Sequence, residues 1–401
     1  MRILYLHQYF KTPSEPGTTR SYHFARYLVE RGNTVIMITS QCKGTSRRFT
    51  YTENVDGISV IYIRNKYSNK MGKYTRIFSF IKFMIYASIV SFFQKDIDVV
   101  FATSTPLSIG VPALIMRWYY RVPMIFELRD LWPQYAIEYG VLKNRLLIKL
   151  AQLLEFVIYR YSSHIITTTP SIKDLLVSRN DINSKIDVIP IGSNLELYGS
   201  IENGSAVCEV LKNDKFIVMY VGTVSTVNAI DKVIEAFRHI RNYQIELWII
   251  GDGKCKQSLF KKVNSLGLAN VKFFDPVAQD LIPKYLYISD LCVISAQNRK
   301  VAEAIFPNKL FDYLAAGKPV IVNFYGVCMK LILDNECGCF VKPDDALAFA
   351  KKIIELKENP DQMKRMGINA RNVAERLLNR RKLAKDFLVV FEKVYNDAKT
   401  M

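Results

Sequence analysis

Short apolar runs alternate with helix-like segments along most of this chain of 401 residues. Because such alternation is typical of strand–helix–strand units, it predicts α/β domains built on parallel sheets. The runs of the first half are "RILYLH", "TVIMITS", "ISVIYI", "VVFATS", "PMIFELR", "HIITTT" and "DVIPIG". Those of the second half are "KFIVMYVG", "IELWIIGDG", "VKFFD", "LCVIS", "KPVIVN" and "GCFVK". Two such series predict two doubly wound domains, whose ligands bind at the carboxyl ends of the strands.

The boundary between the two series lies where the periodicity fails, in the stretch "ELYGSIENGSAVCEVLKN". We therefore predict an N-terminal domain over residues 1–195, a linker over 196–213 and a second domain over 214–375. Residues 376–401 follow the last strand of the second sheet, so their helix is expected to pack back on the first domain. The two domains are expected to face each other across a central cleft.

The charge of the chain is strongly unbalanced, with 55 basic and 37 acidic residues and a formal net charge of +18. Such an excess indicates a polyanionic partner: a nucleic acid, an anionic membrane surface or a phosphorylated substrate. The sequence has no zinc-ligand spacing, helix-turn-helix signature or RNP motif, so we expect no nucleic-acid partner.

The cysteines and the first residues bear on the compartment. The seven cysteines are scattered, and only Cys337 and Cys339 are close in sequence, which indicates reduced thiols in a cytosolic protein. The opening "MRILYLHQYF" lacks the apolar core and cleavage site of a secretory signal. A cytoplasmic location is therefore expected.

One segment predicts contact with a membrane. Residues 77–93, "IFSFIKFMIYASIVSFF", are apolar around nearly the whole helical circumference, with Lys82 inside. The segment falls short of the ~20 residues that a transmembrane helix needs, so it is buried between layers or lies on a lipid surface. The preceding residues are basic at Arg64, Lys66, Lys70, Lys73 and Arg76. We predict peripheral attachment to the anionic inner face of the cytoplasmic membrane, with an ordinary core helix as the alternative.

The stretch "EAIFPNKLFDYLAAGKPVIV", residues 303–322, is the strongest candidate for a binding site. Pro307 suits the entry of a helix, whose N-terminus offers free N–H groups and partial positive charge to a phosphate. Lys309 adds a mobile cation, and Asp312, three residues on, can accept two hydrogen bonds from a ribose diol. The alternative is an exposed ion pair between Lys309 and Asp312.

Other phosphate-binding and metal-binding patterns are weak. "GDGKCKQ" lacks the third glycine of a dinucleotide fingerprint, and no P-loop occurs. Asp96 and Asp98 form a D-x-D pair, but they precede the strand "VVFATS" and so lie at the edge away from the predicted ligand. We therefore expect no metal cofactor.

Four stretches of the second half, "GDGKCKQSL", "GLANVKFFDP", "SDLCVIS" and "FDYLAAGKPVIV", together resemble the nucleotide-binding half of GT-B glycosyltransferases of family 4. The opening "HQYFKTPSEPGTTRSYHFARYLVERGNTV" resembles the acceptor side of that family. "ATSTPLSIG" and "FELRDLWPQ" are similar to the WbuB-type, L-fucosaminyl transferase-like enzymes of O-antigen and capsule assembly. The resemblance covers nearly the whole chain and implies the GT-B fold of two Rossmann-like domains.

The resemblance also implies roles for individual residues. The nucleotide-sugar donor would contact Gly222, Thr223, Gly251, Val277, Arg299, Pro307, Asn308, Lys309, Leu310 and Asp312. The acceptor would contact Tyr9, Gly17, Thr18 and Arg129. The catalytic set would be Lys309, Asp130 for orienting the acceptor or the sugar, and Arg20 for approaching the diphosphate. For Asp130 a salt bridge or a helix cap is the alternative, and for Arg20 a surface position.

The chain departs from the family pattern at several positions. Asp312 stands where the family has the second glutamate of its E-x7-E motif, and Ala304 stands at the position of the first, with Glu303 beside it. Residues 223–228 are neutral where the family has an arginine and a lysine, so Lys309, with Arg299 or Lys300, would balance the diphosphate. The family's "IPNG" turn is "IPIG" here.

The resemblance implies a retaining transferase that moves a hexose or deoxyaminohexose from a UDP-sugar to a lipid-diphosphate-linked glycan, without a metal. A UDP-sugar epimerase of the same architecture is one alternative. A non-catalytic membrane-surface binding protein is the other, because several family positions differ.

Overall fold

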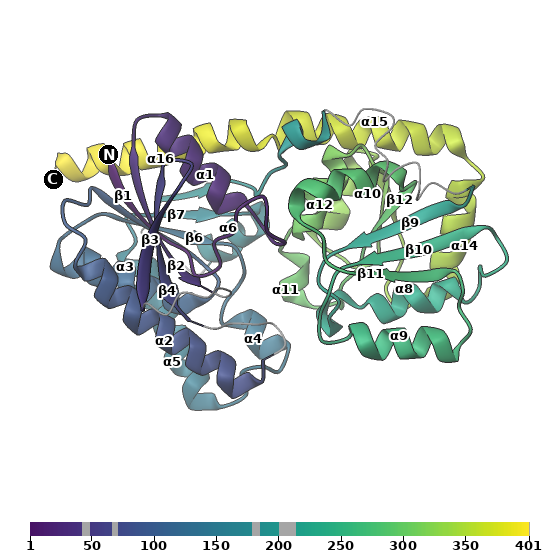
Figure 1. The fold of residues 1–401 in the computed structure, drawn as a ribbon, viewed down its shortest axis with the longest axis horizontal. Coiled ribbons are helices and arrows are strands. Elements are labelled where there is room, and N and C mark those ends of the chain that lie inside the picture. Colours follow the sequence, from purple (N-terminus) through teal and green to yellow (C-terminus); the bar gives the residue numbers. More distant parts are fainter. Residues whose placement is uncertain (42–48, 66–70, 179–184, 200–213, 401) are drawn as a thin grey trace. The chain divides into compact units, whose positions relative to one another are not determined.

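The computed structural model describes residues 1–41, 49–65, 71–178, 185–199 and 214–400, which form two compact units (Figure 1). Unit 1 comprises Met1–Thr12, Thr19–Pro190 and Arg381–Met401, and unit 2 comprises Pro13–Thr18 and Ile191–Arg380. The chain thus passes between the units four times, at Thr12/Pro13, Thr18/Thr19, Pro190/Ile191 and Arg380/Arg381. Residues 200–213 of the predicted linker lie outside the described residues.

The sheet of unit 1 has the strand order β3-β4-β2-β1-β5-β6-β7-β8, and its pairs are parallel except β3 with β4. Its strands are β1 (Arg2–Leu6), β2 (Thr34–Gln41), β3 (Thr50–Val55), β4 (Ile58–Arg64), β5 (Val99–Thr103), β6 (Met124–Leu128), β7 (His164–Thr167) and β8 (Lys185–Val188). Its helices are α1 (Arg20–Glu30), α2 (Lys73–Phe92), α3 (Gly110–Tyr119), α4 (Gln134–Glu138), α5 (Arg145–Tyr161), α6 (Pro170–Val177) and α16 (Arg380–Lys399).

Helices cover both faces of the unit 1 sheet, as its central strands require. The strands β1, β5 and β6 are buried along their length apart from Arg2, so both faces need apolar cover. Helices α1 and α16 pack on one face, where Phe387 contacts Phe24 and Phe101 at ring-centroid distances of 4.8 and 5.1 Å. Helices α2, α3 and α5 form the layer on the other face (Figure 1).

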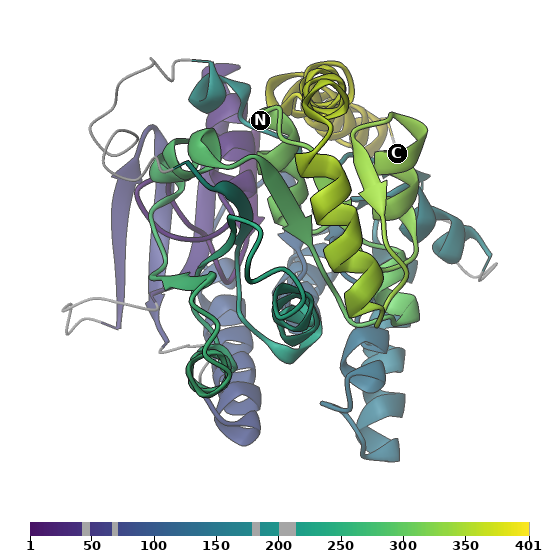
Figure 2. The ribbon, with the colours of Figure 1, turned by 90° about the vertical axis from the view of Figure 1, so that its right-hand side faces the viewer.

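The sheet of unit 2 is all parallel, with the order β11-β10-β9-β12-β13-β14. Its strands are β9 (Phe216–Val221), β10 (Ile245–Ile250), β11 (Val271–Phe274), β12 (Leu291–Ile294), β13 (Val320–Val322) and β14 (Gly338–Phe340). Its helices are α8 (Ile230–Phe237), α9 (Lys256–Ser265), α10 (Ile282–Ile288), α11 (Lys300–Glu303), α12 (Asn308–Ala315), α13 (Val327–Asp334), α14 (Ala346–Lys357) and α15 (Pro360–Leu377). In the view of Figure 2, α15 and α14 lie towards the reader.

Alternate residues of the unit 2 strands enter two separate cores. Ile217 and Met219 pack with α10, α12 and α15, whereas Val218 and Tyr220 pack with α8 and α14 on the other face. These two sheets with helices on both faces confirm the predicted pair of α/β domains with parallel strands. The sequence pattern missed β3, because "TYTENV" is polar and only partly buried at an antiparallel sheet edge.

A buried ion pair fixes the carboxyl edge of the unit 1 sheet. Arg20 begins α1, is fully buried, and donates from Nε and Nη2 to Glu127 Oε1 of β6 at 2.9 and 2.7 Å. Thr103 of β5 donates to the other oxygen of Glu127, at 2.5 Å. Arg20 also donates to the carbonyls of Ile189 and Pro190, which follow β8. The guanidinium thus joins α1 to the ends of β6 and β8, and Glu127 extends the network to β5.

Arg20→Ala should destabilise unit 1 by about 3–5 kcal/mol, because it leaves the Glu127 carboxylate buried without its partner. Arg26→Ala is the matched control on the same helix, since Arg26 pairs with Glu30 at the surface, at 3.2 Å. The control should cost at most about 1 kcal/mol. Urea unfolding followed by circular dichroism measures both, and equal losses of stability would contradict the structural role of Arg20.

Candidate functional site

The strand order of the unit 2 sheet reverses direction between β9 and β12. These neighbours are parallel, and the chain leaves β9 towards β10 on one side and β12 towards β13 on the other. Ligands of open α/β sheets bind outside such a reversal point. The segments that reach it are the loop of residues 222–229 and the first turn of α12.

Lys309, in the first turn of α12, is the cation at this position. Its Nζ donates to Tyr220 Oη and to Asn228 Oδ1, both at 3.2 Å, and lies 4.5 Å from the centroid of the Tyr220 ring. Asn228 in turn donates to the carbonyl of Thr223 at 2.8 Å, and Tyr220 Oη donates to the same carbonyl at 2.8 Å. The ammonium therefore has a fixed position at the strand end.

Burial changes the acid–base behaviour of Lys309. Desolvation of the ammonium lowers its pKa from 10.5 to about 8. Its contacts with Tyr220 and Asn228 are with neutral groups, and no carboxylate of the described residues pairs with its positive charge. The predicted surface ion pair between Lys309 and Asp312 is therefore not the arrangement found. A desolvated cation without a counter-ion suits an anionic ligand.

Glycines let the loops of this edge approach closely. A Cβ on Gly222, whose φ is +143°, would lie 3.0 Å from Lys309 Cε. A Cβ on Gly251 would lie 2.0 Å from the carbonyl oxygen of Gly222, and one on Gly253 would lie 2.2 Å from that of Val224. Gly251 thus serves loop packing, and Gly222 makes room for the lysine stem.

The N-terminus of α12 has the form expected of an anion-binding helix start. Pro307 precedes it in extended conformation, and no side chain caps the helix. Asn308 is exposed at its first position, so N–H groups of this turn remain open to a ligand. Leu310, predicted to contact the donor, is instead fully buried in the apolar core, and its N–H bonds to the Pro307 carbonyl at 2.9 Å.

Asp312 has a hydrogen-bond partner that the sequence did not predict. Tyr198 Oη donates to its Oδ1 at 2.9 Å, while Oδ2 accepts no hydrogen bond within the described part of the chain. Burial raises the pKa of this carboxyl, whereas the nearby Arg380 and the Tyr198 bond lower it. Arg380 is itself held by the carbonyl of Gly192, at 2.7 Å. One carboxylate oxygen therefore remains for a ligand diol.

The other residues predicted to contact the donor are Thr223, Val277 and Arg299. Thr223 and Arg299 are exposed, and Arg299 directly precedes the short helix α11, which begins at Lys300. Val277 is half-buried against the core. Glu303 ends α11 with its backbone against Gly326, where an added Cβ would lie 2.1 Å from the Glu303 carbonyl oxygen.

The carboxyl edge of unit 1 contains buried polar groups without partners. His7 and Gln8 follow β1 and are 2% and 0% exposed. Within the described residues, His7 Nδ1 and both amide atoms of Gln8 have no hydrogen-bond partner. Leaving such groups unpaired costs about 1–3 kcal/mol each, so a polar ligand would be stabilised there. Burial and then the charge of Arg129 lower the pKa of His7 well below 6.5, so its imidazole is neutral.

The predicted residues of the segment after β6 lie near the end of β5. Thr105 Oγ1 donates to Asp130 Oδ2 at 3.0 Å, and Ser104 Oγ accepts from the N–H of Arg129 at 3.0 Å. Both Asp130 and Arg129 are half-buried. The salt bridge and cap suggested as alternatives for Asp130 are not among its contacts in the described structure.

The remaining acceptor candidates and Arg20 divide between the units. Tyr9 belongs to unit 1, whereas Gly17 and Thr18 belong to a segment of unit 2. The predictions for Arg20 were wrong on both counts, because it is fully buried and its donors serve Glu127 and two carbonyls. Its Nε, Nη1 and Nη2 atoms all donate within unit 1, so the guanidinium serves the fold of that unit.

The arrangement of the acidic side chains bears on the prediction that no metal is bound. Among the described residues, no group of three or more His, Cys, Asp or Glu side chains is arranged to hold a metal ion. Asp98 accepts from the N–H of Arg2 at 2.7 Å, and Asp96 is exposed beside it, at the amino end of β5.

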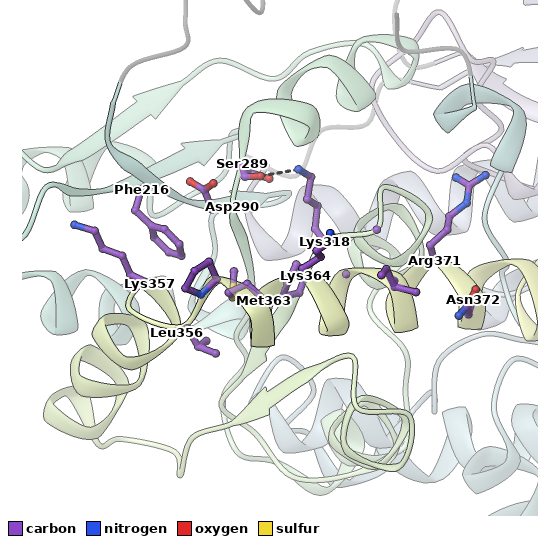
Figure 3. Close-up of a pocket in the computed structure, with 15 residues that line it drawn as sticks. Phe216, Ser289, Asp290, Lys318, Leu356, Lys357, Met363, Lys364, Arg371 and Asn372 are labelled. Atoms are coloured by element: carbon purple, nitrogen blue, oxygen red, sulfur yellow. Dashed lines mark hydrogen bonds between the residues drawn. The ribbon is translucent and has the colours of Figure 1, made fainter. Parts of the chain in front are cut away.

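A pocket of about 660 Å³ lies at the opposite edge of the unit 2 sheet, where β9, β12 and β13 begin (Figure 3). Two of its cations, Lys318 and Arg371, have structural partners. Lys318 donates to the carbonyls of Ser289 and Tyr287 at 2.7 and 3.0 Å, and Arg371 donates to that of Ala315 at 2.7 Å. These carbonyls end α10 and α12, so the charges complete two helix C-termini.

Comparison with known families agrees with this architecture. The family "Glycosyl transferases group 1" matches residues 208–373, and "Glycosyltransferase Family 4" matches residues 17–197. The chain therefore contains glycosyltransferase group 1 and family 4 domains, which support a transferase enzyme.

Curated relatives are distant. A putative colanic acid biosynthesis glycosyl transferase, WcaI of Escherichia coli K12, is 28% identical over 184 residues, 44% of this chain and 43% of that protein. The probable glycosyltransferase WbjE of Pseudomonas aeruginosa is 21% identical over 268 residues, 65% of this chain and 66% of that protein. The chain thus spans about half to two thirds of the length of these relatives.

Solved structures share the fold. Sucrose-phosphate synthase from Thermosynechococcus elongatus has a TM-score of 0.80 at 17% identity and covers 99% of each chain. Anabaena HepE in complex with UDP and glucose has a TM-score of 0.71 at 17% identity, covering 97% of this chain and 99% of that one. At these identities the likeness establishes the GT-B fold.

Tyr220→Phe should lower the pKa of Lys309 further below about 8, because the ammonium loses one hydrogen-bond acceptor while staying buried. A titration of ¹³Cε-labelled lysines by NMR measures this pKa, with Lys309→Met assigning the signal. Tyr287→Phe, a half-exposed tyrosine of the same unit, is the control. An unchanged or raised pKa in Tyr220→Phe would contradict the described contact.

Proposed function

We propose that this chain, which carries the two glycosyltransferase domains, transfers a sugar from a UDP-sugar to a lipid-linked glycan with retention of anomeric configuration. The observation that carries the proposal is the position of Lys309, a desolvated cation at the reversal point of the unit 2 sheet. The HepE structures, which contain UDP, support a uridine nucleotide as the donor.

The donor diphosphate would lie at the first turn of α12. There the ammonium of Lys309 and the open N–H groups of the helix would stabilise the negative charge that develops as the sugar leaves. A bound diphosphate would also raise the pKa of Lys309 from about 8, because the opposite charge favours the ammonium form. Asp312 Oδ2 would accept hydrogen bonds from the ribose, with Oδ1 held by Tyr198.

The acceptor would use the carboxyl edge of unit 1. His7 and Gln8 offer buried polar atoms that a sugar hydroxyl could satisfy. Asp130, oriented by Thr105, is the carboxylate we assign to positioning the acceptor or the transferred sugar. The departing phosphate oxygen can take the acceptor proton, so this account needs no protein base.

The finer assignment follows from sequence resemblance and from the names of the relatives. The proposed donor sugar is a hexose or a deoxyaminohexose such as N-acetylfucosamine, as in WbuB-type enzymes. The proposed pathway is assembly of O-antigen or another surface polysaccharide, which fits the named role of WcaI in colanic acid biosynthesis. The acceptor would then be a lipid-diphosphate-linked glycan at the cytoplasmic face of the membrane.

Incubation with a panel of UDP-sugars, with and without a lipid-diphosphate glycan, tests this proposal. We expect UDP release that depends on both the donor and the acceptor. Conversion of a UDP-sugar into an isomer without acceptor would identify an epimerase instead. Nucleotide binding without turnover of any sugar would favour the non-catalytic alternative.

Lys309→Ala should lower kcat by about 10²–10³, or about 3–4 kcal/mol, because it removes charge stabilisation that grows in the transition state. Asp312→Asn should mainly raise the KM for the donor, since ribose contacts persist from ground state to transition state. Lys330→Ala, an exposed lysine of the same unit, is the control and should behave like wild type. Steady-state kinetics of UDP release measure these effects. A kcat close to wild type in Lys309→Ala would contradict the proposed role of Lys309 in stabilising the transition state.

A further inference from the structure

The helix layer α2–α3–α5 of unit 1 has an unusually apolar outer surface. On α2, Phe78, Ile81, Ile85 and Ile89 are 68%, 45%, 49% and 49% exposed, at a spacing of three to four residues. These side chains follow one outward stripe of the helix, where a soluble protein normally places polar residues.

Helix α5 repeats the pattern of α2. Leu146, Leu150, Leu153 and Phe156 are 66%, 52%, 58% and 48% exposed, again three to four residues apart. Its buried side includes the acid of the helix, Glu155, which accepts from Tyr159 Oη at 3.2 Å. The outward side of α5 thus has a row of large apolar side chains, unlike that of an ordinary surface helix.

The three helices form one continuous layer. The Tyr120 hydroxyl, just after α3, donates to the Phe92 carbonyl of α2 at 2.7 Å. The rings of Trp118 on α3 and Tyr161 on α5 are 5.5 Å apart, centroid to centroid. A Cβ on Gly110 would lie 2.4 Å from Ile158 Cδ1, so α3 and α5 pack closely. The two apolar stripes therefore flank α3 on a single surface, and a contiguous exposed apolar surface of this kind marks an interaction site.

The charge around this surface has one sign. Residues 71–95, 107–121 and 143–162 contain ten lysines and arginines and one acid, the buried Glu155. Trp118, Tyr119 and Tyr161, exposed at the ends of α3 and α5, have the amphipathic rings that are enriched at membrane–water interfaces. Apolar stripes, interfacial aromatic rings and surrounding cations together match an anionic lipid surface.

Two other occupants fit less well. A second copy of the same face would bring like charges together in a symmetric contact. Within the described residues, α2 is long and apolar enough to span a bilayer by length and composition, over Thr75–Phe92 with 22% of the segment buried. However, Phe83 and Ala87 are buried in the unit, and Asn65 donates to the Ser79 carbonyl at 3.2 Å. These contacts hold α2 in the layer.

We infer that the outer surface of α2, α3 and α5 binds unit 1 to an anionic bilayer. The apolar stripes would insert into the interfacial region of the bilayer, between the headgroups and the acyl chains. This surface is broader than the segment 64–93 that the sequence indicated, because α5 and the end of α3 also contribute to it. Of the predicted basic residues, Lys66 and Lys70 lie outside the described residues. The inference stands apart from the proposed transfer reaction, since it concerns only lipid binding.

Flotation with vesicles tests the inference without any substrate. The full chain should bind phosphatidylcholine vesicles more strongly as phosphatidylglycerol is added, and less strongly as salt is raised. Ile85→Ser/Leu150→Ser/Leu153→Ser should lower the partition coefficient by about tenfold or more, since three inserted side chains are lost. Leu347→Ser/Leu377→Ser/Val389→Ser is the matched control, with exposures of 50%, 44% and 52% outside the layer. It should bind like wild type.

Two further readouts distinguish docking from other uses of the surface. Brominated lipid should quench tryptophan fluorescence, and Trp118→Phe should remove most of that quenching. Sedimentation velocity without lipid should show no concentration-dependent association. Vesicle binding that is unchanged in the layer variant would overturn the inference. A second result would also overturn it: the wild-type chain self-associates and does not bind vesicles, and the layer variant no longer self-associates. The surface would then be an interface between copies of this chain.

Discussion

The constraint on which this structure depends is that a parallel strand buried on both faces must be connected by a crossover. Each crossover returns the chain to the edge where the strands begin, so the carboxyl ends of all parallel strands meet at the opposite edge. In unit 2 this rule brings Tyr220, Asn228 and Lys309 together from segments up to 89 residues apart. In unit 1 it gathers His7, Thr105 and Asp130. The candidate sites are thus consequences of topology, refined by local contacts.

The chemistry at the unit 2 edge follows from desolvation. Lys309 is surrounded by a ring, a hydroxyl and an amide oxygen, so its ammonium is held in place but not neutralised. The pocket at the other edge of the same sheet also contains cations, yet Lys318 and Arg371 there complete helix C-termini. Lys309 differs from these two cations in lying at the carboxyl edge of the sheet, beside neutral groups and the open first turn of α12.

The sequence predicted the buried strands well, because apolar β-branched runs bounded by turns have few other uses. It did not predict Tyr198 as the partner of Asp312, since 114 residues separate them and no spacing rule applies. It misassigned Arg20, because the ion pair with Glu127 depends on burial rather than on a local motif. The stripe on α5 was also missed: its leucines fit an ordinary core-facing helix, and only the solvent exposure of Leu150 and Leu153 shows otherwise.

The central claim is that the donor nucleotide binds at the reversal point of the unit 2 sheet. Amide hydrogen exchange with and without UDP tests it most directly, because it maps protection without assuming a sugar or an acceptor. The account predicts slowed exchange in the loop of residues 222–229 and in the first turn of α12, and none around Lys318 and Arg371. Protection confined to that opposite edge, or no protection in unit 2 at saturating UDP, would contradict it.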